Sequence, residues 1–465
     1  MLRGQFHVRV SEGVRDPITA TALVLESVHN GRTLDTAVLV SCDVVSISEE
    51  LLGTVRREVA ARESAIDPNK IIMNATHTHT APEIHPGVSE AMFGPLFYDL
   101  QVMAPREYID FAARRIADCV VAAWRRRAPG GISYALGRAV VGRNRRWTSF
   151  DGVSTMYGNT DDPRFSHIEG YEDHALHILC TWSPRRELTG MVLNLACPAQ
   201  VSESEYKISA DFWHETRTRL REAYGGQLFV LPQCSPAGDQ SPHHIFRKRA
   251  EERMLKLRGM TRRDDIADEI ANGVARVMPV LREHIDWEPP LRHVAETIRL
   301  SRRAITAEDV AAALAEAKQW REKYERHLRE LEENPAKKKE PRWYVPVTQA
   351  LRRALHLERV AERYEAQQKD PTYPVEVHVV RLGDVAFATN PFEYYLDFGI
   401  QIQARSRAVQ CFLIQLAGPG TYLPTARAMA QGAYGAAPAS TAVGAQGGVE
   451  LANRTVELIN SLWEE

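Results

Sequence analysis

Two histidines stand one residue apart in the segment Asn74–Pro82, which reads NATHTHTAP and closes the apolar run Lys70–Met73. On an extended segment, residues i and i+2 face the same side, so the imidazoles of His77 and His79 are expected to reach one point. The segment follows a predicted strand, and open α/β sheets bind ligands at the carboxyl ends of their strands. Because imidazole is the commonest metal-binding side chain, the pair indicates either a metal site or two polar residues in a turn.

Two further segments carry side chains that can act on a carbonyl group. Ser241 lies in QCSPAGDQSPHH after an apolar run. A serine on a tight turn after a strand is a candidate nucleophile or oxyanion contact, and the alternative is a turn residue that caps a helix. Glu393 lies in ATNPFEYYLDFGIQI and is expected to begin a helix after a strand. There it is either favoured by the helix dipole or an oxygen ligand for zinc.

Together with other segments in the same order, these motifs resemble those of the neutral ceramidases. The matching segments, each with its family counterpart, are THTHTAP with THTHSGP, NRRW with NRSP, KISADF with ISGDN, QCSPAGDQSP with QSNAGDVSPN, NPFEYY with PGEFTT, and GTYLPT with GYVTT. Shared order at several sites is far more specific than one motif. The chain is therefore identified as a divergent, bacterial-type member of the neutral ceramidase-like superfamily, with the likeness running from Asp16 to the C-terminus.

The resemblance implies a zinc-dependent amide hydrolase that binds Zn²⁺. His77, Glu393 and Tyr422 match residues that bind zinc in the family. The family's second zinc histidine is absent, and Cys197 stands in the corresponding stretch, NLACPAQVSESEYKISADF. A thiolate is a good zinc ligand, and zinc lowers the pKa of a thiol, so Cys197 is the expected replacement. The alternatives are that Cys197 is a small buried residue and that the missing ligand is His85, His214 or His243.

Three more positions match catalytic residues of the family. Arg145 matches an active-site arginine, Ser241 matches the serine proposed as nucleophile, and His79 matches the second histidine of the motif, beside the metal. The metal would polarise the carbonyl group and lower the pKa of bound water. Arg145 and His79 would hydrogen-bond the developing oxyanion or the leaving group. Ser241 either attacks the carbonyl or orients the water.

The elements that position these residues follow the pattern of an α/β protein with a mixed sheet core flanked by helices. Apolar runs of strand length predict strands at residues 21–27, 36–45, 70–75, 132–141, 174–182, 188–196, 227–231, 293–300, 375–390 and 410–416. Helical patterns lie between several of them, at 49–63, 108–127 and 210–224, the last with Ser209 as its expected N-cap. The strands between 132 and 198 follow one another without helices, which indicates that part of the sheet is antiparallel.

Residues 306–368 differ from the rest because they are almost wholly helix-forming and highly charged. Asn334-Pro335 and Pro341 interrupt the pattern, so the segment predicts a helical hairpin inserted into a single catalytic domain, 1–465. The simplest interpretation is a solvated scaffold arm, and the alternatives are a lid and a surface through which a homo-oligomer forms. The Gly- and Ala-rich segment 417–448 is expected to be a long functional loop.

The composition excludes several classes of protein. The chain has 465 residues, 44% of them hydrophobic, and a net charge of −2, so it can bury a large core and has no basic excess for a nucleic-acid partner. Six cysteines without a C-x-x-C pair argue against a disulfide framework. The N-terminal segment has no apolar signal region, and no run is long enough to span a membrane. We therefore expect a cytoplasmic protein without stable membrane insertion that acts on a small-molecule substrate.

Departures from the family pattern bear on that substrate. The chain leaves no room for the C-terminal immunoglobulin-like domain of the ceramidases, and the helical hairpin is not part of their pattern. We therefore expect hydrolysis of an amide (N-acyl) bond in a small or polar compound rather than in ceramide. The alternatives are a metal-dependent enzyme acting on an ester or carbohydrate derivative, and a non-catalytic binding or scaffold homologue.

Overall fold

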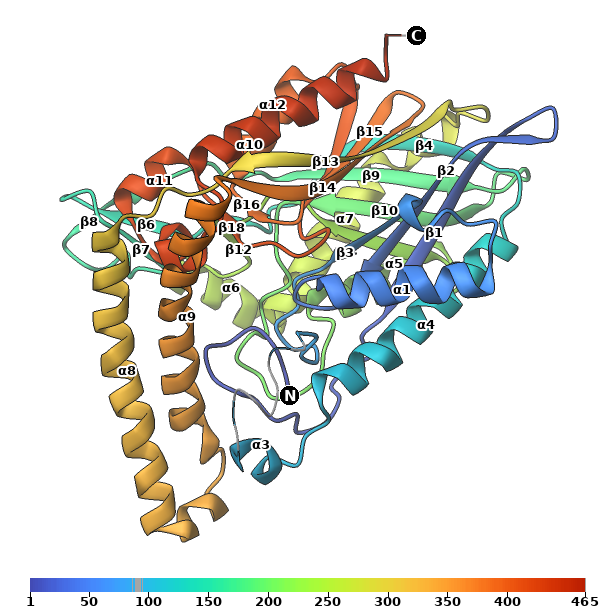
Figure 1. Ribbon diagram of the computed structural model, residues 1–465. Helices are drawn as coiled ribbons and strands as arrows, with labels where there is room; N and C mark the ends of the chain where they lie inside the picture. Colours follow the sequence, from blue (N-terminus) through green and yellow to red (C-terminus); the bar gives the residue numbers. More distant parts are fainter. Residues whose placement is uncertain (86, 88–92, 94, 465) are drawn as a thin grey trace.

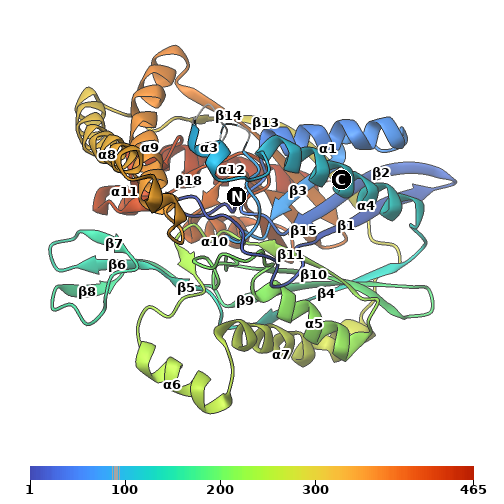
Figure 2. The same cartoon turned by 90° about the horizontal axis from the view of Figure 1, so that it is seen from below.

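Three β-sheets meet at one apolar core, and helices cover the outer face of each sheet (Figures 1 and 2). The structure is a computed structural model, and it describes all residues of the chain except 86, 88–92, 94 and 465. The mixed α/β architecture predicted from the sequence is confirmed.

The first sheet has the order β1-β2-β3, formed by Ala20–His29, Arg32–Cys42 and Ile71–Ala75. β1 and β2 are antiparallel, whereas β3 runs parallel to β2. Helices α1 (Glu49–Arg62) and α4 (Pro105–Arg125) pack on its outer face. The alternation of β2 explains this layering, since Val38 and Val40 contact the helices while Ala37 and Leu39 join the central core.

The second sheet has the order β11-β10-β9-β4, formed by Phe229–Cys234, Leu188–Leu195, Ala175–Trp182 and Gly131–Arg138. β4, β9 and β10 are antiparallel, which confirms the expectation from their spacing. Helices α5 (Phe212–Tyr224) and α7 (Arg262–Glu283) cover it. The predicted cap of α5 was wrong: Asp211 is the N-cap, whereas the Ser209 hydroxyl donates to Asp16 at 2.7 Å.

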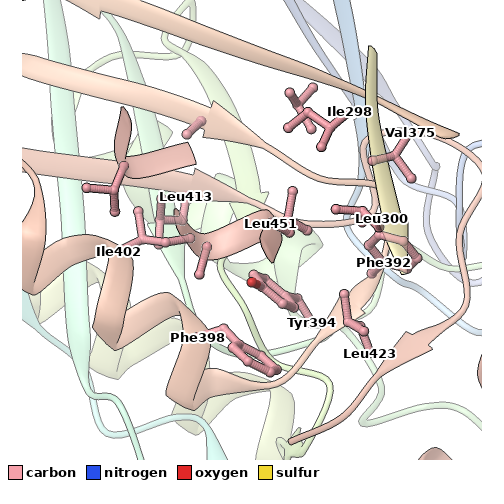
Figure 3. Packing of buried hydrophobic residues seen from close by; sticks show 14 of the residues in the cluster. Ile298, Leu300, Val375, Phe392, Tyr394, Phe398, Ile402, Leu413, Leu423 and Leu451 are labelled. Carbon is pink, nitrogen blue, oxygen red and sulfur yellow. The ribbon is translucent and has the colours of Figure 1, made fainter. Parts of the chain in front are cut away.

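The third sheet has the order β13-β14-β15-β17, formed by Leu291–Ser301, Thr372–Leu382, Val385–Thr389 and Gln410–Ile414. The single strand predicted over 375–390 is two antiparallel strands, because Gly383 turns the chain with φ +62°. Helices α10 (Leu396–Arg405) and α12 (Ala445–Ser461) pack on this sheet, and Figure 3 shows residues of the cluster between them.

The inner faces of all three sheets contribute to the central core. Phe387 and Phe412 lie at its centre with ring centroids 4.8 Å apart, and both are fully buried. Truncating one of these rings to alanine typically costs about 3–5 kcal/mol. The sheets are thereby fixed relative to one another, together with the loops that leave their ends.

The predicted helical hairpin is present as α8 (Ala307–Glu333) and α9 (Tyr344–Lys369), which project from the sheets as an adjacent pair (Figure 1). Thr306 and Asp309 form a capping box at the start of α8, which marks the helix start expected from the sequence. The buried face of α9 packs on the N-terminal segment through Val347, Leu351 and Val8. No helix among the described residues is long and apolar enough to cross a membrane.

Short elements connect these layers near the ends of the sheets. They are α3 (Pro95–Asp99), β5 (Arg143–Asn144), β6 (Arg146–Ser149), β7 (Ser154–Met156), β8 (Phe165–Ile168), β12 (Gln240–Ser241), α6 (Lys248–Arg258), β16 (Glu393–Tyr394), β18 (Tyr422–Leu423) and α11 (Ala426–Gln431). The helix expected to begin at Glu393 begins instead at Leu396, and Glu393 belongs to strand β16.

Candidate active site

His77 lies just after the end of β3 in a backbone conformation that few residues adopt. Its φ is +68°, so the segment is not the extended one predicted. The amide of His77 donates to the Val44 carbonyl at 3.0 Å, and its Nδ1 lies 2.6 Å from the Val45 carbonyl. Because a carbonyl only accepts, Nδ1 carries a proton, which leaves Nε2 as the ring nitrogen that faces the site. The strained backbone and this bond together aim Nε2 away from the sheet.

Glu393 and Tyr422 reach the same point from two paired strands. They are direct register neighbours in the parallel pair β16 and β18. Glu393 Oε2 lies 3.5 Å from His77 Nε2, and the Tyr422 hydroxyl hydrogen-bonds to the Glu393 carboxylate. Burial acts to raise the pKa of Glu393, but the charge and hydrogen bond of His77, with Arg145 and Tyr422, hold it below its ordinary value. Glu393 is therefore an anion whose side chain keeps 19% of its surface exposed.

Gly238 allows the turn of PAGDQSP to approach these strands. A Cβ at this position would lie 2.3 Å from the Glu393 carbonyl oxygen. The Gly238 amide donates to the Tyr394 carbonyl at 2.9 Å, which ties the turn to β16. The glycine of this motif is thus required by close approach of two backbones.

Arg145 is buried beside this group and is almost fully engaged. Its Nη1 contacts the Tyr157 hydroxyl at 2.9 Å and Gln200 Oε1 at 3.5 Å. Its Nη2 contacts the Gly238 carbonyl at 2.9 Å and the Tyr422 hydroxyl at 3.2 Å, and it lies 3.9 Å from Glu393 Oε2. A guanidinium has five donors, and Nε is the one without a partner among the described residues. Arg145 therefore holds a fixed positive charge and one spare donor at the site.

His79 completes the cluster on the side of the N-terminal segment. Its Nε2 lies 3.2 Å from His77 Nε2 and 2.7 Å from Gln200 Nε2, and its Nδ1 lies 3.5 Å from Glu203 Oε2. Burial and the neighbouring His77 hold the pKa of His79 well below its ordinary value. His79 is therefore a neutral imidazole at neutral pH.

The chain is similar to known proteins in its structure but not in its sequence. No protein-family model and no curated protein sequence matches the chain. The neutral ceramidase from Pseudomonas aeruginosa has a similar structure, with 14% identity and a TM-score of 0.62 over 96% of this chain and 69% of that protein. A ceramidase complexed with C2 is similar over 100% of this chain and 72% of its own length, with 15% identity and a TM-score of 0.64.

The chain has the fold of a neutral ceramidase. This confirms the structural side of the resemblance that the ordered motifs indicated. At such low identity the likeness concerns the fold, so the chemistry of the site has to be argued from its own residues.

Among the described residues, Ser241 has no hydrogen bond to His77, Glu393 or Tyr422. It lies on β12, which pairs with β5, and is fully buried. Its Oγ accepts a hydrogen bond from the amide of His243 at 3.1 Å. Strand β5 directly precedes Arg145 in the chain. Its pairing with β12 therefore places the backbone of Ser241 beside the site. Its role as nucleophile or water-orienting residue stays a prediction.

Cys197 lies in the apolar core beneath the second sheet instead of beside Glu393. Its Sγ contacts the Pro198 carbonyl at 3.6 Å, and no other hydrogen bond of this thiol is formed within the described part of the chain. Burial, followed by the nearby Cys234, raises its pKa well above the ordinary value, so the thiol stays protonated. This is the environment of a small core residue, the alternative left open by the sequence. Its ligand role stays a prediction that the geometry does not favour.

Gln200 and Glu203, which the sequence analysis did not select, reach the site from the loop after β10. Gln200 contacts both His79 and Arg145, as described above. Glu203 Oε1 lies 3.1 Å from His243 Nε2, so Glu203 links His243 to His79. The other alternative ligands lie elsewhere: His85 contacts Glu83 at 3.0 Å, and His214 belongs to α5.

The residues present fit a bound cation. The Gln200 amide nitrogen only donates, so His79 Nε2 accepts from it, and His77 Nε2 lies 3.2 Å from this atom. His77 Nε2 also lies 3.5 Å from the Glu393 carboxylate, and a proton or a metal cation between these two acceptors would relieve their repulsion. Ligand atoms of tetrahedral zinc lie about 3.3–3.6 Å apart at bond lengths of about 2.0–2.2 Å, close to these spacings.

The number of side chains that could bind a metal ion at this site is nevertheless small. Among the described residues, no three or more His, Cys, Asp or Glu side chains form a group that could hold a metal ion. The site offers two ligands of these types, His77 and Glu393, and adds the phenol of Tyr422. His79 lies beside them, where the sequence placed it.

Proposed function

We propose that this protein is a zinc-dependent hydrolase of an amide (N-acyl) bond in a small or polar substrate. One observation carries the proposal: His77, Glu393, Tyr422 and Arg145 converge from four separate segments on a ceramidase fold. Catalytic zinc sites commonly have three protein ligands, and an imidazole, a carboxylate and a phenol make such a set. In the family that the motifs resemble, the matching positions bind zinc.

His77, Glu393 and Tyr422 would hold the ion, which supplies a Lewis acid that polarises a carbonyl group and acidifies water. The Val45 carbonyl holds the proton of His77 on Nδ1 and so keeps Nε2 free as a ligand atom. Arg145 neutralises part of the charge of Glu393 and orients the Tyr422 hydroxyl. These residues thus need little rearrangement before a substrate binds.

Arg145 and His79 supply the remaining chemistry of amide hydrolysis. The free Nε–H of Arg145 can donate to the oxyanion that develops when the carbonyl carbon becomes tetrahedral. His79 is neutral and lies 3.2 Å from His77 Nε2, where its ring can hydrogen-bond the leaving group. Gln200 orients its ring through Nε2, and the Glu203 carboxylate lies 3.5 Å from its Nδ1.

The proposal is tested by metal content and substrate specificity together. Zinc bound per chain would be measured by mass spectrometry after purification without chelators, for the natural protein, His77→Ala, Glu393→Gln and the control His167→Ala. His167 is exposed on β8, and its Nδ1 lies 3.0 Å from the Ser166 hydroxyl. About one zinc per chain is expected in the natural protein and the control, with loss in both site variants. A natural protein that takes up no zinc even when it is supplied would refute the metal site.

The zinc-loaded protein would then be assayed with matched N-acyl amides, esters and glycosides. Cleavage of the amides, lost in Arg145→Gln, supports the amide hydrolase. Cleavage of only esters or glycosides would replace it by the corresponding alternative activity. Absence of turnover across the panel, with zinc bound, would favour a binding homologue.

A further inference from the structure

The helical hairpin presents a row of three arginines and one histidine to the segments that border the site. Arg352, His356, Arg359 and Arg363 on α9 are spaced by four, three and four residues, which places them on one face of the helix. His356 contacts the rings of Phe6 at 5.2 Å and Tyr434 at 5.7 Å between centroids. This face of α9 therefore packs on the N-terminal segment and on the loop after α11.

Tyr434 connects this row with the candidate active site. Its ring lies 5.5 Å from that of Tyr422, between centroids. Burial, followed by the charge of Glu393, raises the pKa of Tyr434 to about 12, although 40% of the residue is exposed. The positive charges of Arg3, Arg145 and Arg359 act on the same phenol in the opposite direction. Tyr434 thus contacts Tyr422 of the site and lies within the electrostatic influence of Arg3 and Arg359, which belong to other segments.

Most cationic groups in this row have protein partners. Arg352 donates to the Gln5 carbonyl at 3.1 Å and lies 3.4 Å from Glu83 Oε2, and Arg363 donates to the Pro438 carbonyl at 2.6 Å. Arg3 pairs with Glu83 at 3.1 Å through one terminal nitrogen. One buried carboxylate, Glu83, therefore serves both Arg3 and Arg352.

Arg359 is the exception. Within the described ranges, its guanidinium has neither a hydrogen bond nor an ion pair, and the residue is partly open to solvent although neighbouring segments surround it. Burial and then the like charge of Arg3 lower its pKa, and the acid that acts on it, Glu362, forms no ion pair with it. A cation crowded by another cation without an acceptor is electrostatically unfavourable until an anion binds.

We infer that Arg359 and Arg3 bind an acidic group of the substrate, a carboxylate or a phosphate, so that the enzyme acts on N-acyl compounds that carry such a group. Guanidinium groups recognise both anions through paired, charge-assisted hydrogen bonds. The inference rests on the proposed function for the reaction, but the anion site itself can be tested without turnover. It also gives the hairpin a role in specificity, since Arg359 comes from α9.

Binding would be measured by calorimetry with three probes that share an acetamide group. N-acetylglycine carries a carboxylate, N-acetyl-O-phosphoethanolamine carries a phosphate, and N-acetylglycinamide is neutral. The proteins are the natural chain, Arg359→Gln, Arg3→Gln, and the control Arg326→Gln. Arg326 is an exposed residue of α8 and changes the net charge equally.

At least one acidic probe should bind more tightly than the neutral one to the natural chain and the control. Arg359→Gln should weaken that binding by about tenfold or more, as expected for the loss of a charge-assisted hydrogen bond. Arg3→Gln should weaken it too. The probe that responds more strongly identifies the anion as carboxylate or phosphate. Equal affinity for acidic and neutral probes, or unchanged affinity in Arg359→Gln, would overturn the inference.

Hydrolysis of the same probes separates this inference from the proposed function. If the zinc-loaded protein cleaves the neutral amide with the same kcat/KM as the acids, the anion site is refuted and the hydrolase stands. If acid binding depends on Arg359 but no probe or other N-acyl compound is cleaved, the anion site is supported and the hydrolase is refuted.

Discussion

The protein contains two buried pairs of histidines whose ring nitrogens lie about 3 Å apart, and only one pair has the features of an active site. His293 Nε2 lies 3.0 Å from His378 Nδ1, much as His77 Nε2 lies 3.2 Å from His79 Nε2. In the first pair, His293 Nδ1 faces the Thr36 carbonyl and His378 Nε2 faces Glu376, each at 3.0 Å. Every ring nitrogen of that pair has a protein partner.

The pair of His77 and His79 is open by comparison. His79 Nδ1 has no hydrogen-bond partner among the described residues, and the two Nε2 atoms lie 3.2 Å apart beside the Glu393 carboxylate. His77 also holds a φ of +68°, a conformation that costs on the order of 1–3 kcal/mol, whereas His293 and His378 lie in the regular strands β13 and β14. The comparison teaches that proximity of two histidines is weak evidence for a site, and that unsatisfied nitrogens on a strained backbone are stronger evidence.

The largest expected effect comes from removing the cation that faces the open pair. Arg145→Gln removes a charge beside Glu393 and the spare donor, Nε–H. We expect kcat to fall by about 10²–10³, the loss typical of one oxyanion-stabilising donor. Steady-state kinetics on an N-acyl substrate would measure it. Arg164→Gln, at an exposed arginine, is the control, and a similar kcat for both variants would remove Arg145 from the mechanism.

The next effect concerns the amide that orients the open pair. Gln200→Ala removes the donor to His79 and a contact to Arg145. Because residues that orient ligands commonly affect metal affinity or activity by about 10–100-fold, we expect kcat/KM to fall within that range. The exposed Gln446 provides a control alanine variant. Wild-type kinetics in Gln200→Ala would show that His79 needs no orientation from this loop.

The pair of His293 and His378 is expected to influence the free energy of unfolding and its dependence on pH. Burial, followed by His378 and Lys70, lowers the pKa of His293 to about 3, below the ordinary value of about 6.5. Between these values the unfolded chain binds more protons than the folded protein. The free energy of unfolding should therefore fall as the pH decreases from about 6.5, by up to about 1.4 kcal/mol per pH unit for this one group.

His293→Phe removes the imidazole that takes up a proton on unfolding. The free energy of unfolding should therefore depend less steeply on pH, by up to about 1.4 kcal/mol per pH unit. The substitution should also lower the free energy of unfolding at pH 7 by about 1–3 kcal/mol, because His378 Nδ1 loses its partner. Urea denaturation at a series of pH values measures both. An unchanged pH slope would show that His293 is not kept neutral by its surroundings.

The smallest effect is expected at Cys197. If it is a core residue, Cys197→Ala should leave the zinc content unchanged and lower the free energy of unfolding by about 1 kcal/mol. Zinc analysis and urea denaturation of the same sample give both numbers. Loss of zinc in a folded Cys197→Ala variant would restore the thiol as a ligand and contradict its place in the core.

Much of the fold could be predicted from the sequence, since strands such as β2 and β3 are apolar and of ordinary length. The errors arose where local pattern was ambiguous. Gly383 lies between two apolar runs and joins two strands, and the Gly-Asp pair there was the available indication. Asp211 displaced Ser209 as the cap of α5 because Ser209 is held by Asp16, a residue far away in the sequence.

Only those residues of the candidate site that belong to the ordered motifs were predicted from the sequence. His77, Glu393, Tyr422 and Arg145 do come together, although His77 uses a left-handed backbone that no pattern indicated. Gln200 was missed because polar residues in the loop after β10 become distinctive only through contacts with His79 and Arg145. Arg359 carried a recognisable helical spacing, but its lack of a partner depends on the folded arrangement.

The most direct test of the account is a crystal structure of the zinc-loaded protein with anomalous data collected on both sides of the zinc absorption edge. We predict one strong anomalous peak for a zinc ion bound by His77 Nε2, the Glu393 carboxylate and the Tyr422 hydroxyl. We predict no peak beside His293 and His378. A zinc-loaded crystal without a peak at His77, or with its zinc between His293 and His378, would contradict the claim that the open pair forms the metal site.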